Sequence, residues 1–395
     1  MGEQALKGIK VLEVGNIVAG PWAGTLLGDF GADVIKVEPP KTGDLMRGMG
    51  RIKDLWFCVE GRNKRCITLN LKSEKGKEMM AELIKEADIL LQNFRPGVFD
   101  RMGFTWERIQ ELNPRLIYVC SSGYGQTGPK AKKPGFDRIG LAEGGFLEVT
   151  GEPDRAPIKP GISVADFYTA LFAALGAMMA LYHRDVMGTG KGQMIDCCLT
   201  DTMLRMQESI LAEYSYDGTI RTRIGNGTFV TIPSGHFKTK DGKYLVLSVT
   251  GDKLFNMWAE KIGRADMITN SKYNNQEARQ KARDEINQIC ADWALEHTID
   301  ECLRILGDDI PAAKVYNVVD ILNEQQYKVR NMILDVATEK FGTIKMQGIV
   351  PKMSETPGEV KWAGKPLGYF NDEIYSKVLH KSQEEIEQMK SEGVI

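Results

Sequence analysis

The sequence lacks the patterns that hold metals or disulfides. Its seven cysteines include no Cys-x-x-Cys pair. Its four histidines are far apart and show neither metal-ligand spacing nor a recognisable Ser-His or Cys-His arrangement: His183, His236, His297 and His380. We therefore expect no metal and no disulfide.

The chain also lacks an excess of charge and a long apolar run. Its 51 basic and 53 acidic residues leave a net charge of −2, which argues against nucleic acid or an anionic membrane as the main partner. Residues 1–6 show no basic, apolar signal segment, and the longest apolar run, near 167–182, is expected to be too short to span a bilayer. We expect a cytoplasmic protein.

What is present is enough apolar sequence for a large core. The 395 residues are 43% apolar, which suits two domains or one elaborated domain. The first part alternates strand-like runs with helical segments, the pattern of a parallel sheet covered by helices. The predicted strands are 9–14, 33–38, 66–71, 89–94, 116–121 and 194–198, and the predicted helices are 21–30, 73–87, 106–113, 167–182 and 200–214.

The sequence pattern changes near residue 220, where turn-forming residues become frequent. The segments 225–227 and 233–235 are expected to lie in a loop, and Lys240-Asp241-Gly242 should join two strands as a hairpin. Helices over 252–306 and a strand over 315–319 should follow, with a final helix at 382–391. We predict a large α/β domain beginning at 1–220, a small α+β domain at 221–330, and a C-terminal segment, 331–395, that returns to the large domain.

Two glycine patterns invite a dinucleotide interpretation. Residues 123–128 match G-x-G-x-x-G after a strand, but Pro129 and a basic loop follow where a phosphate-binding helix should begin. The loop at 15–20 lacks the close glycine pair that lets backbone approach a pyrophosphate. Neither pattern favours an NAD enzyme.

Asp166 stands directly ahead of the apolar helix predicted at 167–182. An Asp at this place usually satisfies free N–H groups of the first helical turn. The other interpretation is a covalent nucleophile, because a buried helix would hold the carboxylate rigidly. The segment alone leaves both open.

Several cations follow predicted strands. Lys72, Arg95 and Arg101 lie at or beyond predicted carboxyl ends, where ligands bind in open α/β sheets. The basic loop 130–133 is either a solvated turn or a phosphate contact. Together these charges are consistent with one polyanionic ligand.

Ordered motifs along nearly the whole chain resemble class III (CaiB/BaiF-type) CoA-transferases. They are Ala19-Gly20-Pro21, residues 31–38, Asn63-Lys64-Arg65, 69–72, 93–97, 123–129, Asp166 in its helix, 189–193, 240–242, and the late region of Pro351, Pro357 and 364–366. The resemblance implies a Rossmann-like large domain and an interlocked homodimer. It also implies acyl-CoA and small carboxylic acids as substrates, with no permanently bound cofactor.

The resemblance also assigns residues. Asp166 is the implied nucleophile, forming a mixed anhydride and then an aspartyl-CoA thioester. Backbone N–H groups of 225–227 or 233–235 are candidates for stabilising the oxyanions, although ordinary turns account for them as well. The implied CoA-binding residues are Val18, Ala19, Leu69, Asn70, Lys72, Asn93, Phe94, Arg95, Arg101 and Asp137.

Some positions depart from relatives. Val18 and Pro39 stand where some relatives have Gln and Arg, and the glycine run of formyl-CoA transferases is missing, which argues against formyl or oxalate chemistry. Residues 203–206 and Tyr214 resemble the carnitine and bile-acid branch. An α-methylacyl-CoA racemase of the same fold is an alternative, but Phe136 stands where its proton-transferring His is expected. A non-catalytic CoA-binding protein is the other alternative.

Overall fold

The computed structural model describes residues 3–228 and 230–395 and divides into two compact units. Unit 1 comprises 1–146, 159–219 and 329–395, and unit 2 comprises 147–158 and 220–328. The C-terminal segment therefore belongs to the same unit as the N-terminal sheet. The fold class expected from the sequence, a mixed α/β protein with a parallel sheet, is confirmed.

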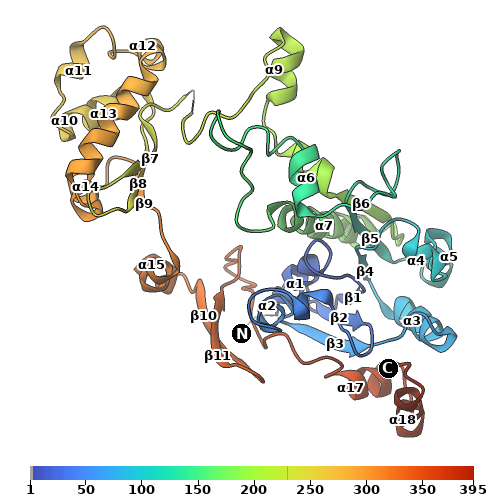
Figure 1. The fold of residues 1–395 in the computed structure, drawn as a ribbon. Coiled ribbons are helices and arrows are strands. Elements are labelled where there is room, and N and C mark those ends of the chain that lie inside the picture. The colour runs from blue at the N-terminus through green and yellow to red at the C-terminus, as the bar shows by residue number, and fades with distance from the viewer. Residues whose placement is uncertain (1–2, 229) are drawn as a thin grey trace. The chain divides into compact units, whose positions relative to one another are not determined.

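A six-stranded parallel sheet organises unit 1, in the order β3-β2-β1-β4-β5-β6 (Figure 1). Its strands are β1 (Lys10–Glu13), β2 (Asp33–Glu38), β3 (Lys64–Thr68), β4 (Ile89–Gln92), β5 (Ile117–Ser122) and β6 (Met194–Cys198). All six were predicted, although β3 and β4 end earlier than expected. The chain order reverses between β1 and β4, which is where open α/β sheets bind ligands.

Helices cover both faces of this sheet. One face packs Leu12, Leu90 and Tyr118 against α3, α5, α17 and α18, and the other packs Val11, Leu91 and Val119 against α1 and α7. The helices before residue 150 are α1 (Pro21–Asp29), η1 (Leu45–Gly48), α2 (Leu55–Glu60), α3 (Glu74–Glu86), α4 (Val98–Arg101), α5 (Trp106–Leu112) and α6 (Asp137–Glu143). The later ones are α7 (Val164–Leu181), its π-helical extension η2 (Tyr182–Val186), α8 (Leu199–Arg205), α9 (Ile210–Asp217), α17 (Asn371–Lys377) and α18 (Gln383–Ser391).

Local chemistry explains where these helices begin. Ser73 and Thr105 accept hydrogen bonds from first-turn N–H groups of α3 and α5, and Pro21 occupies the first position of α1, where no N–H is needed. The prediction of one continuous helix at 200–214 is wrong. The segment breaks into α8 and α9, and Glu208, between them, adopts a φ of +48°.

Helix α7 packs on the sheet through small residues. Its buried face contains Ala170, Ala173, Ala177 and Ala180, which let the helix backbone approach β5 and β6. Within the described part of the chain, 164–186 is the one helix with the length and hydropathy of a membrane span, at 23 residues. The expectation that this run is too short is therefore wrong on length. Its alanine face is buried in the unit 1 core, which is typical of a core helix.

The C-terminal segment completes unit 1. It contains the antiparallel pair β10 (Ile333–Thr338) and β11 (Gly342–Gln347), and then runs along the β3 edge, with α17 against β3. The Asn63 N–H donates to the Trp362 carbonyl at 3.1 Å, and the Tyr375 hydroxyl donates to the Thr68 carbonyl at 2.5 Å. In Figure 1, α17 lies beside β3, and α18 lies next to α17.

Unit 2 contains a three-stranded antiparallel sheet of β7 (Ser234–Lys238), β8 (Tyr244–Ser248) and β9 (Ala312–Lys314). Its helices are α10 (Gly251–Lys261), α11 (Asp266–Thr269), α12 (Gln276–Lys281), α13 (Arg283–Glu296), α14 (Ile299–Leu306), α15 (Val318–Asn323) and α16 (Gln325–Val329).

Three predictions for this unit can be compared with the structure. The hairpin at 240–242 is confirmed. The strand at 315–319 is wrong, because the Asn317 side chain caps α15 and starts a helix there. Residues 234 and 235 lie in β7 and not in a loop.

Candidate active site

Asp166 lies in the first turn of α7 and lines a cavity of about 350 Å³. Among the residues that the structure describes, its carboxylate accepts no hydrogen bond, and Ser163, the N-cap residue, makes no side-chain cap. The Asp166 side chain therefore does not cap the N–H groups of the first helical turn, which was one of the two interpretations of the sequence. The neighbouring Phe167 packs edge-on against Trp22 at 4.9 Å between ring centroids, which holds the turn against α1.

The cavity opens at the carboxyl ends of β1, β4 and β5. Its walls come from the three loops that leave these strands, together with η1, the turn before α6, and the starts of α7 and α8. The lining residues are Asn16, Ile17, Val18, Ala19, Leu45, Asn93, Phe94, Arg95, Pro96, Val98, Ser121, Ser122, Gly123, Lys133, Gly135, Phe136, Asp166 and Leu199. This is the switch point of the sheet, and it lies on the carboxyl edge along which a ligand was expected to bind.

Asn93 organises the loop after β1. Its Oδ1 accepts from the Asn16 N–H at 2.8 Å, and its Nδ2 donates to the Asn16 carbonyl at 2.7 Å. A Cβ on Gly15 would lie 3.0 Å from the Asn93 Oδ1, and one on Gly20 would lie 3.1 Å from its Cβ. The glycines at 15 and 20 therefore make room for Asn93, and this explains them without a pyrophosphate.

The environment of Asp166 disfavours its charge. Burial first, and then the nearby Asp137 carboxylate, raise the pKa of Asp166 from 3.8 to about 7, while the Lys159 ammonium acts in the opposite direction. Such a pKa lets the carboxyl group exchange between its acid and its nucleophilic form near neutral pH.

Asp137 supports the turn that carries Asp166. Its Oδ1 accepts from the Ala165 N–H at 2.8 Å, and its Oδ2 lies 3.4 Å from the Lys159 Nζ. Lys159 also donates to the carbonyls of Pro160 and Ile162, at 2.8 and 3.0 Å. Asp137 is buried and does not line the cavity. It contacts the residues that hold Asp166 in place and not the cavity itself.

Two cations line the cavity, Arg95 and Lys133, and both are exposed. Lys130, from the same basic loop as Lys133, is paired with Glu143. Of the predicted phosphate contacts in that loop, Lys133 is the one that the structure places at the cavity. Arg101 is exposed at the end of α4 and lies outside the lining.

Apart from Asp137 and Arg101, which lie outside the lining, the predicted site residues fall into two groups. The first group lines the cavity together with Asp166 and consists of Val18, Ala19, Asn93, Phe94 and Arg95. Leu69, Asn70 and Lys72 follow β3, at the edge of the sheet, and do not line the cavity. The Asn70 N–H donates to the Val394 carbonyl at 2.7 Å, and Leu69 is buried.

Some lining residues were missed by the sequence reasoning. Ser121 and Ser122 lie within the end of β5, where two small polar residues gave no chemical signal, and Leu45 lies in a short helix that was not predicted. The position of Ser122 has a local reason, since its Oγ accepts from the Gly125 N–H at 2.9 Å.

The glycine motif at 123–128 has a packing role. No helix begins after it until Asp137, and a Cβ on Gly123 would lie 2.8 Å from the Gly135 Cα. The motif therefore lets two loops meet at the cavity wall. Across residues 3–228 and 230–395, no group of three or more His, Cys, Asp or Glu side chains is arranged to hold a metal.

The site thus combines a carboxylate at the switch point of a Rossmann-like sheet with exposed cations. Comparison with known proteins identifies the class. The family model described as CoA-transferase family III matches residues 6–369, and the chain belongs to that family. It is a class III CoA-transferase.

Three relatives illustrate the similarity. The chain is 39% identical over 396 residues to the succinyl-CoA–D-citramalate CoA-transferase of Chloroflexus aurantiacus, covering 99% of this chain and 98% of that protein. It is 33% identical over 415 residues to a formyl-CoA:oxalate CoA-transferase of Streptomyces avermitilis, covering 99% and 100%. The crystal structure of a CaiB/BaiF family protein from Brucella suis matches with a TM-score of 0.86 and 30% identity, covering 95% and 100%.

Proposed function

We propose that Asp166 is the nucleophile through which this enzyme moves CoA from an acyl-CoA to a carboxylic acid. The observation that carries the proposal is a carboxylate without hydrogen-bond partners in the described chain, fixed in the first turn of a helix whose alanine face is buried, and facing a cavity with Arg95 and Lys133. A nucleophile must keep its lone pairs free and its position fixed, and Asp166 meets both conditions.

The proposed reaction proceeds through four acyl transfers. The ionised Asp166 attacks the thioester carbonyl, which gives a mixed anhydride and releases the CoA thiolate. That thiolate attacks the aspartyl carbonyl, which forms an aspartyl-CoA thioester and frees the first acid. The acceptor carboxylate then attacks this thioester, and the thiolate released attacks the acyl carbonyl of the new anhydride.

These steps balance without an external energy source. One thioester is consumed and one is formed, and Asp166 ends as the carboxylate with which it began. Because an anhydride reacts with water, the protein must orient the groups and exclude solvent. Backbone N–H groups would stabilise the oxyanions formed in these steps.

We assign CoA to the carboxyl edge of the sheet. Val18, Ala19, Asn93 and Phe94 would contact the part of CoA nearest the thioester, and Arg95 and Lys133 would pair with its phosphates. Arg101, Leu69, Asn70 and Lys72 would contact CoA farther along the sheet edge. Asp137 would act on Asp166 through the Ala165 N–H more than on CoA itself.

We infer that the acceptor is a small dicarboxylic acid. The acids named for the two relatives, citramalate and oxalate, are both dicarboxylic acids. This favours a dicarboxylate over the carnitine and bile-acid branch that residues 203–206 suggested. Succinyl-CoA is the donor we would try first.

We further propose a cytoplasmic homodimer. The outer face of α7 exposes a strip of large apolar side chains, including Leu171, Leu175, Met178 and Met179. Such a strip is typical of a surface that a partner covers. All seven cysteines are free, as expected in a reducing compartment.

A transfer assay tests the assignment. Wild-type protein and Asp166→Asn should be incubated with succinyl-CoA and a panel of dicarboxylic and monocarboxylic acids. We expect new acyl-CoA from the wild type with dicarboxylates and none from the variant, while both bind CoA with similar Kd. Retained turnover in Asp166→Asn would exclude the mechanism, and exchange of the α-proton of a methylacyl-CoA without transfer would indicate the racemase alternative.

A further inference from the structure

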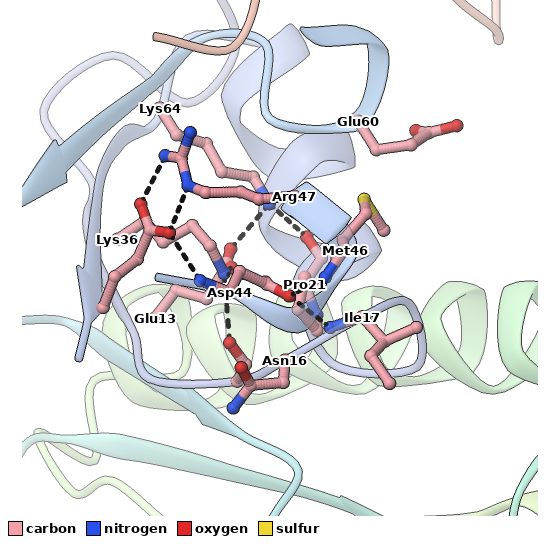
Figure 2. Close-up of polar contacts among 12 residues, drawn as sticks. Glu13, Asn16, Ile17, Pro21, Lys36, Asp44, Met46, Arg47, Glu60 and Lys64 are labelled. Atoms are coloured by element: carbon pink, nitrogen blue, oxygen red, sulfur yellow. Dashed lines mark hydrogen bonds and ion pairs between the residues drawn. The ribbon is translucent and has the colours of Figure 1, made fainter. Parts of the chain in front are cut away.

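A buried network of ion pairs lies next to the loop 16–19, which lines the cavity. The Lys36 Nζ is 2.7 Å from the Glu13 Oε1 and 2.7 Å from the Asp44 Oδ2, and the Lys64 Nζ is 2.8 Å from the Glu13 Oε2. Figure 2 shows these side chains converging beside the turn that carries Asn16 and Ile17. All four charged groups are at most 2% exposed, so each charge depends on its partners.

One member of this network reaches the loop directly. The Asp44 Oδ1 accepts from the Ile17 N–H at 2.9 Å and from the Met46 N–H at 2.8 Å. Lys36 donates to the Gly15 carbonyl at 3.0 Å, and Lys64 donates to the Pro21 carbonyl at 2.6 Å. The two lysines therefore hold the backbone on either side of the loop, while Asp44 holds its centre.

The centre of the loop needs such a restraint. Ile17 has a φ of +67°, a left-handed conformation that β-branched residues rarely adopt. Without a fixed acceptor for its N–H, the segment would relax toward an extended conformation. The residues displaced by that relaxation, Asn16 to Ala19, form one wall of the cavity that contains Asp166.

The charges of the network keep this acceptor ionised. Burial opposes ionisation of Asp44, but the Lys36 ammonium and the backbone donors outweigh it and lower the pKa of this carboxyl group. In the same way, burial opposes the charge on Lys36, and Asp44 and Glu13 together raise its pKa above the usual value.

We propose that Asp44, held by Lys36, is a positioning residue that fixes the loop 16–19 in its strained conformation and thereby sets the affinity of the cavity for acyl-CoA. This inference rests on the proposed function, because it takes the cavity to be the CoA site. It assigns the network a role in substrate affinity that a merely structural ion cluster would not have.

The matched control is Asp29, a second buried carboxylate of unit 1. It is 1% exposed and pairs with Arg62 and Asn63, with no hydrogen bond to the loop 16–19. Asp44→Ala and Asp29→Ala each remove one buried carboxylate that has a cationic partner. Their thermal stabilities should fall by similar amounts.

The readouts are KM for acyl-CoA, kcat, and amide exchange at Ile17. For Asp44→Ala we expect a KM increase of tenfold or more, a kcat change under threefold, and faster exchange at Ile17 with strand β1 still protected. For Asp29→Ala we expect KM within twofold of wild type and unchanged exchange at Ile17. A KM for Asp44→Ala no higher than that of the control would overturn the proposal.

Wild-type protein provides a test that needs no variant. The Ile17 amide should exchange at least a hundredfold more slowly than an unprotected amide, and exchange at the unprotected rate would overturn the proposal even if Asp44→Ala does not fold. The two proposals fail separately. A protein that forms no intermediate on Asp166 but loses Ile17 protection and CoA affinity in Asp44→Ala would refute the mechanism and retain the positioning role.

Discussion

Replacing Asp166 with Asn should stabilise the protein, and increasingly so as the pH rises. The carboxyl group has a pKa of about 7 in the folded protein against 3.8 for the ordinary group. The folded state therefore binds more protons than the unfolded state between these values, and wild-type stability falls as the pH rises through that window. Asn has no charge to desolvate, so the stability of the variant does not carry this loss at high pH.

The size of the effect follows from the pKa difference. Each pKa unit corresponds to about 1.4 kcal/mol, so the raised pKa of Asp166 costs about 4 kcal/mol of stability at pH 8, where the group is ionised in both states. At pH 5 the cost is about 2 kcal/mol, because the group is then protonated in the folded protein and ionised in the unfolded one. The stability advantage of Asp166→Asn should therefore widen by about 2 kcal/mol between these pH values. Below the ordinary pKa, where both states are protonated, the cost disappears.

Urea unfolding of both proteins at pH 5 and pH 8, at one protein concentration, measures this difference. Asp196→Asn is a useful control, because Asp196 is an exposed carboxylate of the same unit that accepts a hydrogen bond from the Gln126 N–H at 2.8 Å. If Asp166→Asn and the wild type show the same pH dependence, then Asp166 is not the strained, desolvated carboxylate described here.

Three further predictions follow from the site. Because the ionised Asp166 attacks, kcat/KM should fall about tenfold per pH unit below its pKa of about 7, and a flat profile from pH 5 to 8 would contradict this. Arg95→Ala and Lys133→Ala should each raise KM for acyl-CoA about tenfold, more at low salt, whereas Lys132→Ala, from the same loop but outside the cavity lining, should not. Gly24→Ala should cost about 1–3 kcal/mol in urea unfolding, because its Cβ would lie 2.2 Å from the pinned Glu13 Oε2. Gly48→Ala, whose Cβ would meet nothing within 4 Å, should be nearly neutral, and equal losses in both variants would refute the packing argument.

The sheet of unit 1 could be predicted from the sequence because its strands are short, almost continuously buried apolar runs separated by helical segments. The errors came where a side-chain cap or the backbone conformation of a single residue decided the structure. Asn317 starts α15 at a place where Val315, Val318 and Val319 suggested a strand. The left-handed conformation of Glu208 divides a helix whose residues are otherwise good helix formers.

The candidate site was predictable in part. Arg95 was identified because the carboxyl ends of parallel strands gather at one edge, whereas Val18, Ala19, Asn93 and Phe94 came from the resemblance to class III CoA-transferases. Asp137 was assigned to CoA, whereas the structure places its carboxylate on the Ala165 N–H, a contact between residues far apart in sequence. The role of Asp44 could not be predicted either, because its hydrogen bond to Ile17 depends on a backbone conformation that composition does not reveal.

Trapping of the intermediate on Asp166 tests the central claim most directly. Purified protein should be incubated with succinyl-CoA, reduced with borohydride, digested, and mapped by mass spectrometry. We predict that the Asp166 side chain is converted to the alcohol expected from reduction of its thioester, and that Asp137 and Asp196 are unmodified. An unmodified Asp166 in a protein that still transfers CoA would contradict the account.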